Sequence, residues 1–225
     1  MKAKIIEEKR VQSSTKVVVF IHGSYAVGNS AKNLAAAERI RSEGIASTVL
    51  YESSRDWIRC SSARTSDDWV AAFAGKTYQH ELDDLLEVLE YINKEQRPTE
   101  IFLSGTSYGA GLALLAADHV PGITRLLLSA PQITPPEHDN GPIYDGFPTD
   151  KKFGAVLRRF NGSLSVLIGD HDTGERWRDA HLIIDNAATE KKRLSVLHAN
   201  HNFGDKPDCP SMRWVYGEEH VQAFR

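Results

Sequence analysis

A serine in a glycine-rich turn is the residue of this chain whose surroundings most clearly indicate chemistry. An apolar run over residues 101–104 leads into the motif Gly-Thr-Ser-Tyr-Gly, whose serine is Ser107, and an Ala/Leu/Gly-rich segment follows at once. This strand–turn–helix context is typical of a tight turn that strains its central residue and exposes the hydroxyl above a sheet edge. The same five-residue pattern also occurs in ordinary turns, but the flanking strand and helix favour a serine nucleophile.

Two other groups of reactive side chains also follow apolar runs. Gly169-Asp170-His171-Asp172 comes after the run at 164–168, and His198 and His201 come after the run at 193–197. A serine hydroxyl is a weak nucleophile near neutral pH, so it needs a base to accept its proton and an acid to orient that base. The chain therefore holds all three kinds of group that acyl transfer by serine requires.

The elements that must position these groups alternate along the chain. Continuous apolar runs predict buried strands at residues 16–21, 46–51, 101–104, 124–129, 164–168 and 193–197, with a weaker edge strand within 3–12. Helical patterns occupy residues 31–44, 78–94, the segment after Ser107, a stretch through Trp177 and Ile183, and a short segment near 218–224. Residues 52–76 and 131–150 read as long loops, the second with a short helix just beyond it.

Alternating strands and helices predict an α/β fold, a three-layer α/β/α sandwich with a mainly parallel central sheet, and we expect residues 1–225 to form one domain. In such sheets chemistry gathers at the carboxyl ends of the strands, where Ser107 and the two other groups fall. The acidic positions of the 78–94 helix are expected to form a solvated face.

The bulk properties exclude several other classes of protein. The chain has 225 residues and a formal net charge of −3, which gives no reason to expect a nucleic-acid partner. Its two cysteines, Cys60 and Cys209, lie outside any metal or disulfide spacing. No secretory leader and no apolar run of the roughly 20 residues needed to span a bilayer is visible, so we expect no membrane insertion and a cytoplasmic location.

Taken together, these motifs resemble the α/β-hydrolase superfamily, and more loosely its small capless members of the dienelactone-hydrolase or carboxylesterase type. The resemblance extends from the 16–21 strand to Phe203. It depends on His22-Gly23 after that strand, the serine motif at 105–109, the 169–172 segment and the 201–203 segment. The order Ser, Asp, His along the chain is also that of this superfamily.

The resemblance implies a role for each group. The family places its acid three residues after the glycine that ends the strand, which implies Asp172, with Asp170 capping or turning the loop. The family's base, on a loop after the last strand, matches His201, whereas His198 at the strand end is expected to be packed. The oxyanion donors would be the backbone N–H groups of Ser24 and Tyr108.

Other side chains have alternative interpretations. His22 is a satisfied polar residue or holds the oxyanion loop by bonding its own backbone. A metal site built from the histidines and aspartates of the last two groups lacks a paired His/Cys set at zinc spacing, so we expect no metal and no cofactor.

We therefore predict a serine hydrolase that cleaves a carboxylic ester or related acyl compound, a small molecule, through an acyl-enzyme. A thioesterase or small peptidase with the same triad of Ser107, Asp172 and His201 is one alternative. A non-catalytic binding protein on the same fold is another. The stretch of sequence between the 124–129 and 164–168 strands is too short to form a large cap domain. An open site would follow, with Trp57, Tyr144 and Phe147 as its apolar walls or as ordinary packing residues.

Overall fold

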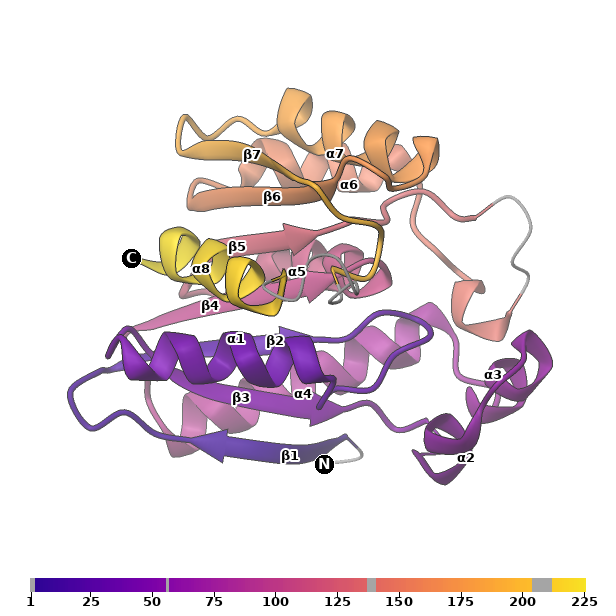
Figure 1. The fold of residues 1–225 in the computed structure, drawn as a ribbon, viewed down its shortest axis with the longest axis horizontal. Coiled ribbons are helices and arrows are strands. Elements are labelled where there is room, and N and C mark those ends of the chain that lie inside the picture. Colours follow the sequence, from indigo (N-terminus) through magenta and orange to yellow (C-terminus); the bar gives the residue numbers. More distant parts are fainter. Residues whose placement is uncertain (1–2, 56, 137–140, 204–211) are drawn as a thin grey trace.

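The fold is built on one sheet of seven strands in the order β1-β3-β2-β4-β5-β6-β7 (Figure 1). The computed structural model describes residues 3–55, 57–136, 141–203 and 212–225. The strands are β1 (Lys4–Lys9), β2 (Lys16–Ile21), β3 (Ser47–Glu52), β4 (Glu100–Thr106), β5 (Ile123–Ser129), β6 (Ser163–Gly169) and β7 (Lys192–Leu197). Only β1 runs antiparallel to its neighbour, β3, and the other described pairs are parallel. The predicted α/β fold with a mainly parallel sheet is therefore confirmed.

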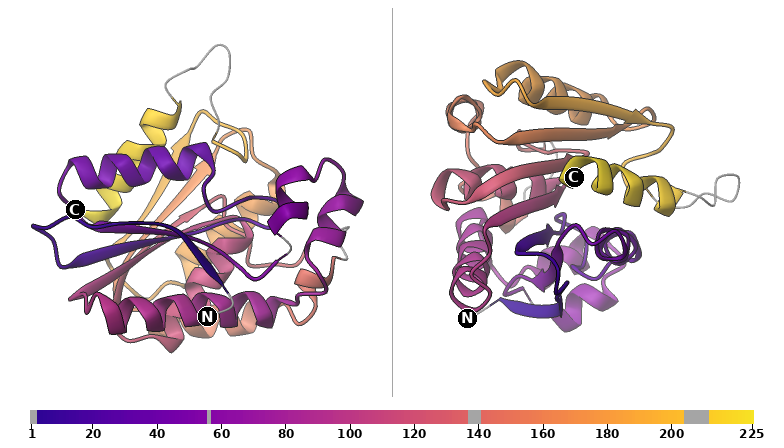
Figure 2. Two further views of the ribbon diagram at one scale, coloured as in Figure 1. Left: turned by 90° about the horizontal axis from the view of Figure 1, so that it is seen from below. Right: turned by 90° about the vertical axis from the view of Figure 1, so that its left-hand side faces the viewer.

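Helices cover both faces of this sheet (Figure 2). They are α1 (Ala31–Ser42), α2 (Trp57–Ser62), α3 (Ser66–Ala72), α4 (Tyr78–Glu95), α5 (Tyr108–His119), α6 (Asp150–Arg159), α7 (Gly174–Asn186) and α8 (Met212–Phe224), with a short 3₁₀ turn η1 (Pro142–Tyr144). Among these helices, none combines the length and apolar character that crossing a bilayer requires.

Each central strand is buried on both sides because its neighbouring side chains enter two different cores. In β2, Val17 and Val19 join the core beneath α4, α5, α6 and α7, whereas Val18 and Phe20 join the core beneath α1 and α8. Alternate residues of a strand point to opposite faces, so a run of apolar residues is needed to fill both. This explains why the continuous runs in the sequence located the strands well.

Residues 52–76 were expected to be irregular, and that expectation was wrong. The segment forms two short helices, α2 and α3. A capping box begins α3, in which Thr65 accepts a bond from the Asp68 N–H and Asp68 accepts one from the Thr65 N–H. A capping box is difficult to recognise in a sequence when the helix that follows it has only two turns.

The last helix also begins earlier than expected, because α8 starts at Met212 rather than near residue 218. Tertiary packing against α1 and the sheet stabilises it. Tyr216 and Phe224 are fully buried, and Phe224 stacks on Phe102 with ring centroids 5.3 Å apart. His220 Nε2 lies 2.8 Å from the Ser104 hydroxyl, which ties the helix to β4. Contacts with residues far away in sequence leave little local signal.

Two glycines allow β4, α5 and β2 to approach closely around Ser107. A Cβ atom on Gly109 would lie 2.5 Å from the His22 carbonyl oxygen and 2.7 Å from that of Ile21. A Cβ on Gly105 would lie 2.5 Å from the Gly109 carbonyl oxygen. These neighbours are backbone atoms of the sheet and helix, which cannot move aside cheaply, so both positions require glycine.

We predict that Gly109→Ala lowers the free energy of unfolding by about 1–3 kcal/mol, the range for overpacking a rigid site. Gly174→Ala is the matched control, because Gly174 also lies in the first turn of a helix but a Cβ there would meet no atom within 4 Å. The control should leave stability unchanged or raise it by about 0.4–1 kcal/mol. Urea unfolding monitored by circular dichroism measures both values. Equal stability of the two variants would contradict the packing argument.

Candidate active site

Ser107 lies in a strained turn between β4 and α5, as the sequence predicted. Its backbone has φ 54° and ψ −120°, a left-handed conformation that residues other than glycine rarely adopt. The cost of such a residue, about 1–3 kcal/mol, must be met by its surroundings. The Ser107 N–H donates to the Ser129 carbonyl at 2.8 Å, and the Ser107 carbonyl accepts from the N–H groups of Ala110 and Gln132. Bonds to β5, to α5 and to the loop after β5 therefore hold the turn.

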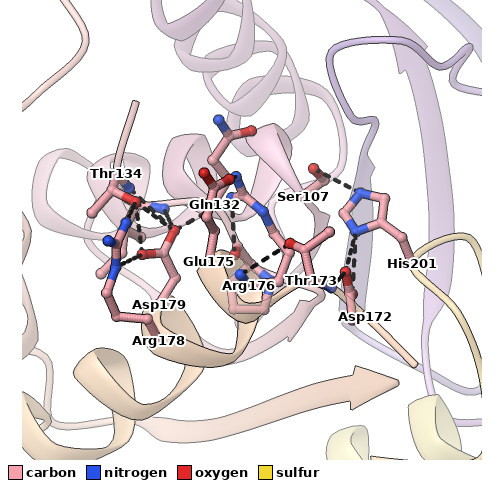
Figure 3. Close-up of polar contacts among 12 residues, drawn as sticks. Ser107, Gln132, Thr134, Asp172, Thr173, Glu175, Arg176, Arg178, Asp179 and His201 are labelled. Atoms are coloured by element: carbon pink, nitrogen blue, oxygen red, sulfur yellow. Dashed lines mark hydrogen bonds and ion pairs between the residues drawn. The ribbon is translucent and has the colours of Figure 1, made fainter. Parts of the chain in front are cut away.

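Three side chains from three strand ends form one hydrogen-bonded chain (Figure 3). His201 Nε2 lies 3.2 Å from Ser107 Oγ, and His201 Nδ1 lies 3.1 Å from Asp172 Oδ1. The Asp172 side chain is fully buried, and its Oδ1 also accepts the Thr173 N–H at 2.8 Å. A carboxylate on Nδ1 places the imidazole with Nε2 toward the hydroxyl, the arrangement that general-base activation of a serine needs.

The two alternative residues pair with each other instead of with the serine. His198 Nδ1 lies 2.8 Å from Asp170 Oδ2, and the Ala199 N–H donates to Asp170 Oδ1 at 3.0 Å. The hydrogen bond from His198 holds the pKa of Asp170 below its ordinary value. His198 was expected to be packed, but its side chain is 75% exposed, so that expectation was wrong. It directly follows β7, the edge strand, which no further strand covers among the described residues.

The loop after β2 lies directly against the serine. A Cβ atom on Gly23 would be 3.5 Å from Ser107 Cβ. His22 is 2% exposed, and its Nδ1 lies 3.0 Å from the Gly23 carbonyl oxygen, which is the bond to its own backbone that the sequence suggested. Burial, reinforced by nearby Arg55, lowers the pKa of His22 to about 4, so the ring is neutral at pH 7 and donates from Nδ1. In a trans peptide C=O and N–H point in opposite directions, so this bond also sets the direction of the Ser24 N–H.

The other expected donor is the Tyr108 N–H at the start of α5. The first N–H groups of a helix have no acceptor within the helix, and the helix dipole adds positive potential there. Tyr108 follows Ser107 directly, so its N–H belongs to the turn itself. The structure thus places both predicted donors on segments that touch Ser107.

A buried ion pair that the sequence did not reveal supports the predicted oxyanion loop, residues 22–28, at the Ser24 carbonyl. Arg55 donates two bonds to Glu81, at 2.9 and 2.6 Å, and a third to the Ser24 carbonyl oxygen at 2.6 Å. Both side chains are nearly inaccessible, at 2% and 1% exposed. Burial opposes the charge of Arg55, but the attraction of Glu81 is larger and raises the pKa of the guanidinium. Burial also opposes the charge of Glu81, but the attraction of Arg55 is larger and holds the pKa of that carboxyl below its ordinary value.

The expectation of a fully solvated acidic face on α4 was therefore wrong. Glu81 and Asp84 are both buried, at 1% and 4% exposed. Asp84 accepts bonds from the N–H and the hydroxyl of Ser54, at 2.6 and 2.7 Å. Both carboxylates bind the segment after β3, so α4 anchors the neighbours of the oxyanion loop. Glu81 lies three residues after Tyr78 and four before Leu85, so helical spacing places it on the apolar face of α4, a signal that the sequence interpretation did not use.

The carboxylate of Glu52 holds the outer part of the loop between β2 and α1. Glu52, at the end of β3, is 4% exposed and accepts a bond from the Gly28 N–H. Burial raises the pKa of Glu52 to about 7. A Cβ on Gly28 would collide with the Tyr51 carbonyl oxygen, which explains the glycine. The loop between β2 and α1 is thus tied at His22, Ser24 and Gly28.

The segment that carries His201 is tied to α1. Lys32 Nζ donates to the Asn202 carbonyl oxygen at 3.1 Å and lies 5.6 Å from the ring centroids of Phe203 and Tyr216. Phe203 is fully buried with φ 47°. The buried ring holds Phe203 in the core two residues after His201, and this restricts where the His201 imidazole can lie.

The aromatic side chains around the site differ from those expected. Phe147 packs against Tyr78 with ring centroids 4.6 Å apart, and Tyr144 packs against Phe147 at 5.8 Å, so both belong to a packed cluster. The side chain of Trp57 lies outside the described residues. Tyr25, next to Ser24, is 42% exposed and contacts Trp69 of α3 edge to face at 5.8 Å. Tyr25 and Trp69 are thus aromatic side chains beside the oxyanion loop that the sequence interpretation missed.

Among the described residues, Asp170, His171 and His198 form the one group of three whose ligand atoms are close enough to hold a metal ion. Cys60 is buried, and Cys209 lies outside the described residues.

Comparison with known proteins identifies the family of this chain. Residues 74–189 match the family model described as serine aminopeptidase, S33 (Hydrolase_4), which spans just over half of the chain. The chain therefore belongs to this family of the α/β-hydrolase superfamily. No protein of curated function matches the chain.

Solved structures match over almost the whole length. Est1E from Butyrivibrio proteoclasticus has a TM-score of 0.70 at 14% identity, covering 98% of both chains, and a second structure of Est1E has ferulic acid bound. Dienelactone hydrolase from Anabaena variabilis has a TM-score of 0.66 at 16% identity over 100% of both chains. A monoacylglycerol lipase from Paleococcus ferrophilus has a TM-score of 0.64 at 14% identity, covering 97% of this chain and 100% of that one. At these identities the likeness establishes the α/β-hydrolase fold.

We predict that replacing the Arg55–Glu81 pair lowers kcat about 10- to 100-fold with little change in KM, because the oxyanion loop loses its support and not its donors. The double variant Arg55→Met/Glu81→Leu is preferred, since Arg55→Met alone would leave a buried unpaired carboxylate. Arg41→Met is the control, because Arg41 pairs with Glu7 and Glu38 at the far end of α1. Steady-state kinetics on any ester that the wild type cleaves provides the measurement. An unchanged kcat in the folded double variant would refute the supporting role.

Proposed function

We propose that this protein is a serine hydrolase that cleaves a carboxylic ester or related acyl compound through an acyl-enzyme on Ser107. The observation that carries the proposal is the chain of hydrogen bonds from Ser107 through His201 to the buried Asp172. A strained turn at the serine and a supported loop beside it add to the case. The family's hydrolases provide a matching class of reaction.

In the proposed reaction, Ser107 Oγ attacks the carbonyl carbon of the substrate while His201 Nε2 takes the hydroxyl proton. Asp172 stabilises the imidazolium that forms. The N–H groups of Ser24 and Tyr108 bind the oxyanion, each worth roughly 3 kcal/mol where such donors have been measured. His201 then gives its proton to the leaving group, and a water molecule, activated by the same histidine, hydrolyses the acyl-enzyme.

The surroundings of Ser107 favour a small substrate with an apolar or aromatic part. Tyr25 and Trp69 offer aromatic surface beside the oxyanion loop, and aromatic rings stack favourably there. The ferulic acid bound to Est1E is a ligand of that kind in a protein of the same fold. We further propose that residues 1–225 act as one catalytic domain without a large cap. A cytoplasmic location stays a prediction from the sequence.

We predict that a fluorophosphonate probe labels the wild-type protein on Ser107 and that Ser107→Ala abolishes both labelling and ester cleavage. Loss of the nucleophile should lower turnover by about ten-thousand-fold or more, since only binding and the oxyanion site remain. Ser61→Ala, an exposed serine of α2, is the control and should label normally. Mass spectrometry of the labelled peptide and p-nitrophenyl ester kinetics are the measurements. Full activity of Ser107→Ala would end the proposal.

The same three side chains would also serve a thioesterase or a small peptidase, and the family's description as serine aminopeptidase makes amides worth testing. We predict that kcat/KM is highest for short-chain esters in a panel of p-nitrophenyl esters, acyl thioesters and aminoacyl amides. In the open site that the sequence predicts, little binding energy would be available for the slower cleavage of an amide. A clear preference for thioesters or amides would replace the ester assignment. Tight binding of esters without turnover would instead favour a binding protein.

A further inference from the structure

A second cluster of reactive side chains lies beside the triad and takes no part in it. It consists of Asp170 and His171, which follow β6, and His198, which follows β7. His171 Nδ1 and His198 Nδ1 each lie 2.8 Å from a different oxygen of the Asp170 carboxylate. The three ligand atoms all lie within 4.8 Å of one another. The proposed mechanism gives none of these residues a task.

The backbone already holds these three residues in place. The Asp170 N–H donates to the Leu197 carbonyl at 2.8 Å, and the His171 N–H donates to the Ala199 carbonyl at 3.0 Å. The Ala199 N–H in turn donates to Asp170 Oδ1 at 3.0 Å, which orients the carboxylate. The cluster therefore sits on the paired ends of two strands. Binding an ion there would cost little ordering of the chain.

The side chains are accessible to an ion from solvent. Asp170, His171 and His198 are 39%, 54% and 75% exposed. The histidine rings meet edge to face, with centroids 4.7 Å apart. Around a tetrahedral zinc ion with bonds of about 2.0–2.1 Å, ligand atoms lie roughly 3.4 Å apart. Binding would move the two nitrogens about half an ångström away from the carboxylate and bring ligand atoms that are now up to 4.8 Å apart closer together, which exposed side chains can do by rotation.

We propose that Asp170, His171 and His198 form a binding site for a divalent transition-metal ion of the zinc type at the rim of the active site. Two imidazoles and one carboxylate suit Zn²⁺, Ni²⁺ and Co²⁺, whereas Mg²⁺ prefers oxygen ligands alone. The three residues supply one face of the coordination shell, and water completes it. The proposal stands apart from the proposed hydrolase activity.

An ion at this site would join the two segments that carry the acid and the base. Asp170 is two residues before Asp172, and His198 is three residues before His201. An ion bound to both segments in the native state, and not to the unfolded chain, stabilises the native state by mass action. The expected effect is a metal-dependent rise in the melting temperature.

The protein is first dialysed against EDTA to remove bound metal. It is then titrated with ZnCl₂ at pH 7 by isothermal titration calorimetry, and thermal melts are recorded in parallel. We expect one site with a micromolar Kd and a melting temperature that rises by about 3–6 °C at ten times Kd. MgCl₂ should produce neither effect. His198→Ala should lose binding at least tenfold, and Asp170→Asn, which keeps an acceptor for the Ala199 N–H, should do the same.

Two controls separate this site from other histidines. His181→Ala removes an exposed histidine of α7 and should bind zinc as the wild type does. His201→Gln removes the triad imidazole and should also keep the wild-type Kd. The proposal is overturned if zinc does not bind, if His198→Ala binds it unchanged, or if His201→Gln abolishes binding, which would place the ion on the triad.

Discussion

The meeting of three backbone segments at Ser107 is the constraint on which the rest of this structure depends. Strand β4, the first turn of α5 and the end of β2 approach so closely that neither Gly105 nor Gly109 can carry a Cβ atom. The chain can turn there only if Ser107 takes a left-handed conformation. The strain of that residue and the packing of the two glycines are thus parts of one geometry, and the same geometry presents the hydroxyl.

Polar interactions around the site hold the surrounding loops in fixed positions relative to the Ser107 turn. The loop after β2 is held through the Gly23 and Ser24 carbonyls by His22 and Arg55, and Lys32 reaches the loop that carries His201. Most of these groups are buried, where an unpaired polar atom is costly and a paired one is rigid. The site therefore has little freedom to rearrange when a substrate enters, which suits electrostatic stabilisation by fixed dipoles.

The sequence revealed the residues whose role depends on local pattern and missed those whose role depends on tertiary contact. Ser107 was recognisable because its turn chemistry and its flanking elements are contiguous. The strands were recognisable because burial on both faces demands unbroken apolar runs, as in Lys16–Ile21. Glu81, by contrast, shares the apolar face of α4 with Tyr78 and Leu85, but no local pattern identifies the partner of its charge, which is Arg55, 26 residues away. The start of α8 was missed for the same reason, since its burial depends on β4 and α1.

The bond between Ser107 and His201 joins residues 94 positions apart, and β5 and β6 lie between their strands in the sheet. Contacts of such long range are slow to form, because the cost of closing the loop precedes any gain. A chain on which β7 has not yet paired would have the hydroxyl without its base. The proposed hydrolysis would then require the completed sheet, and a nascent or partly unfolded copy would not attack esters.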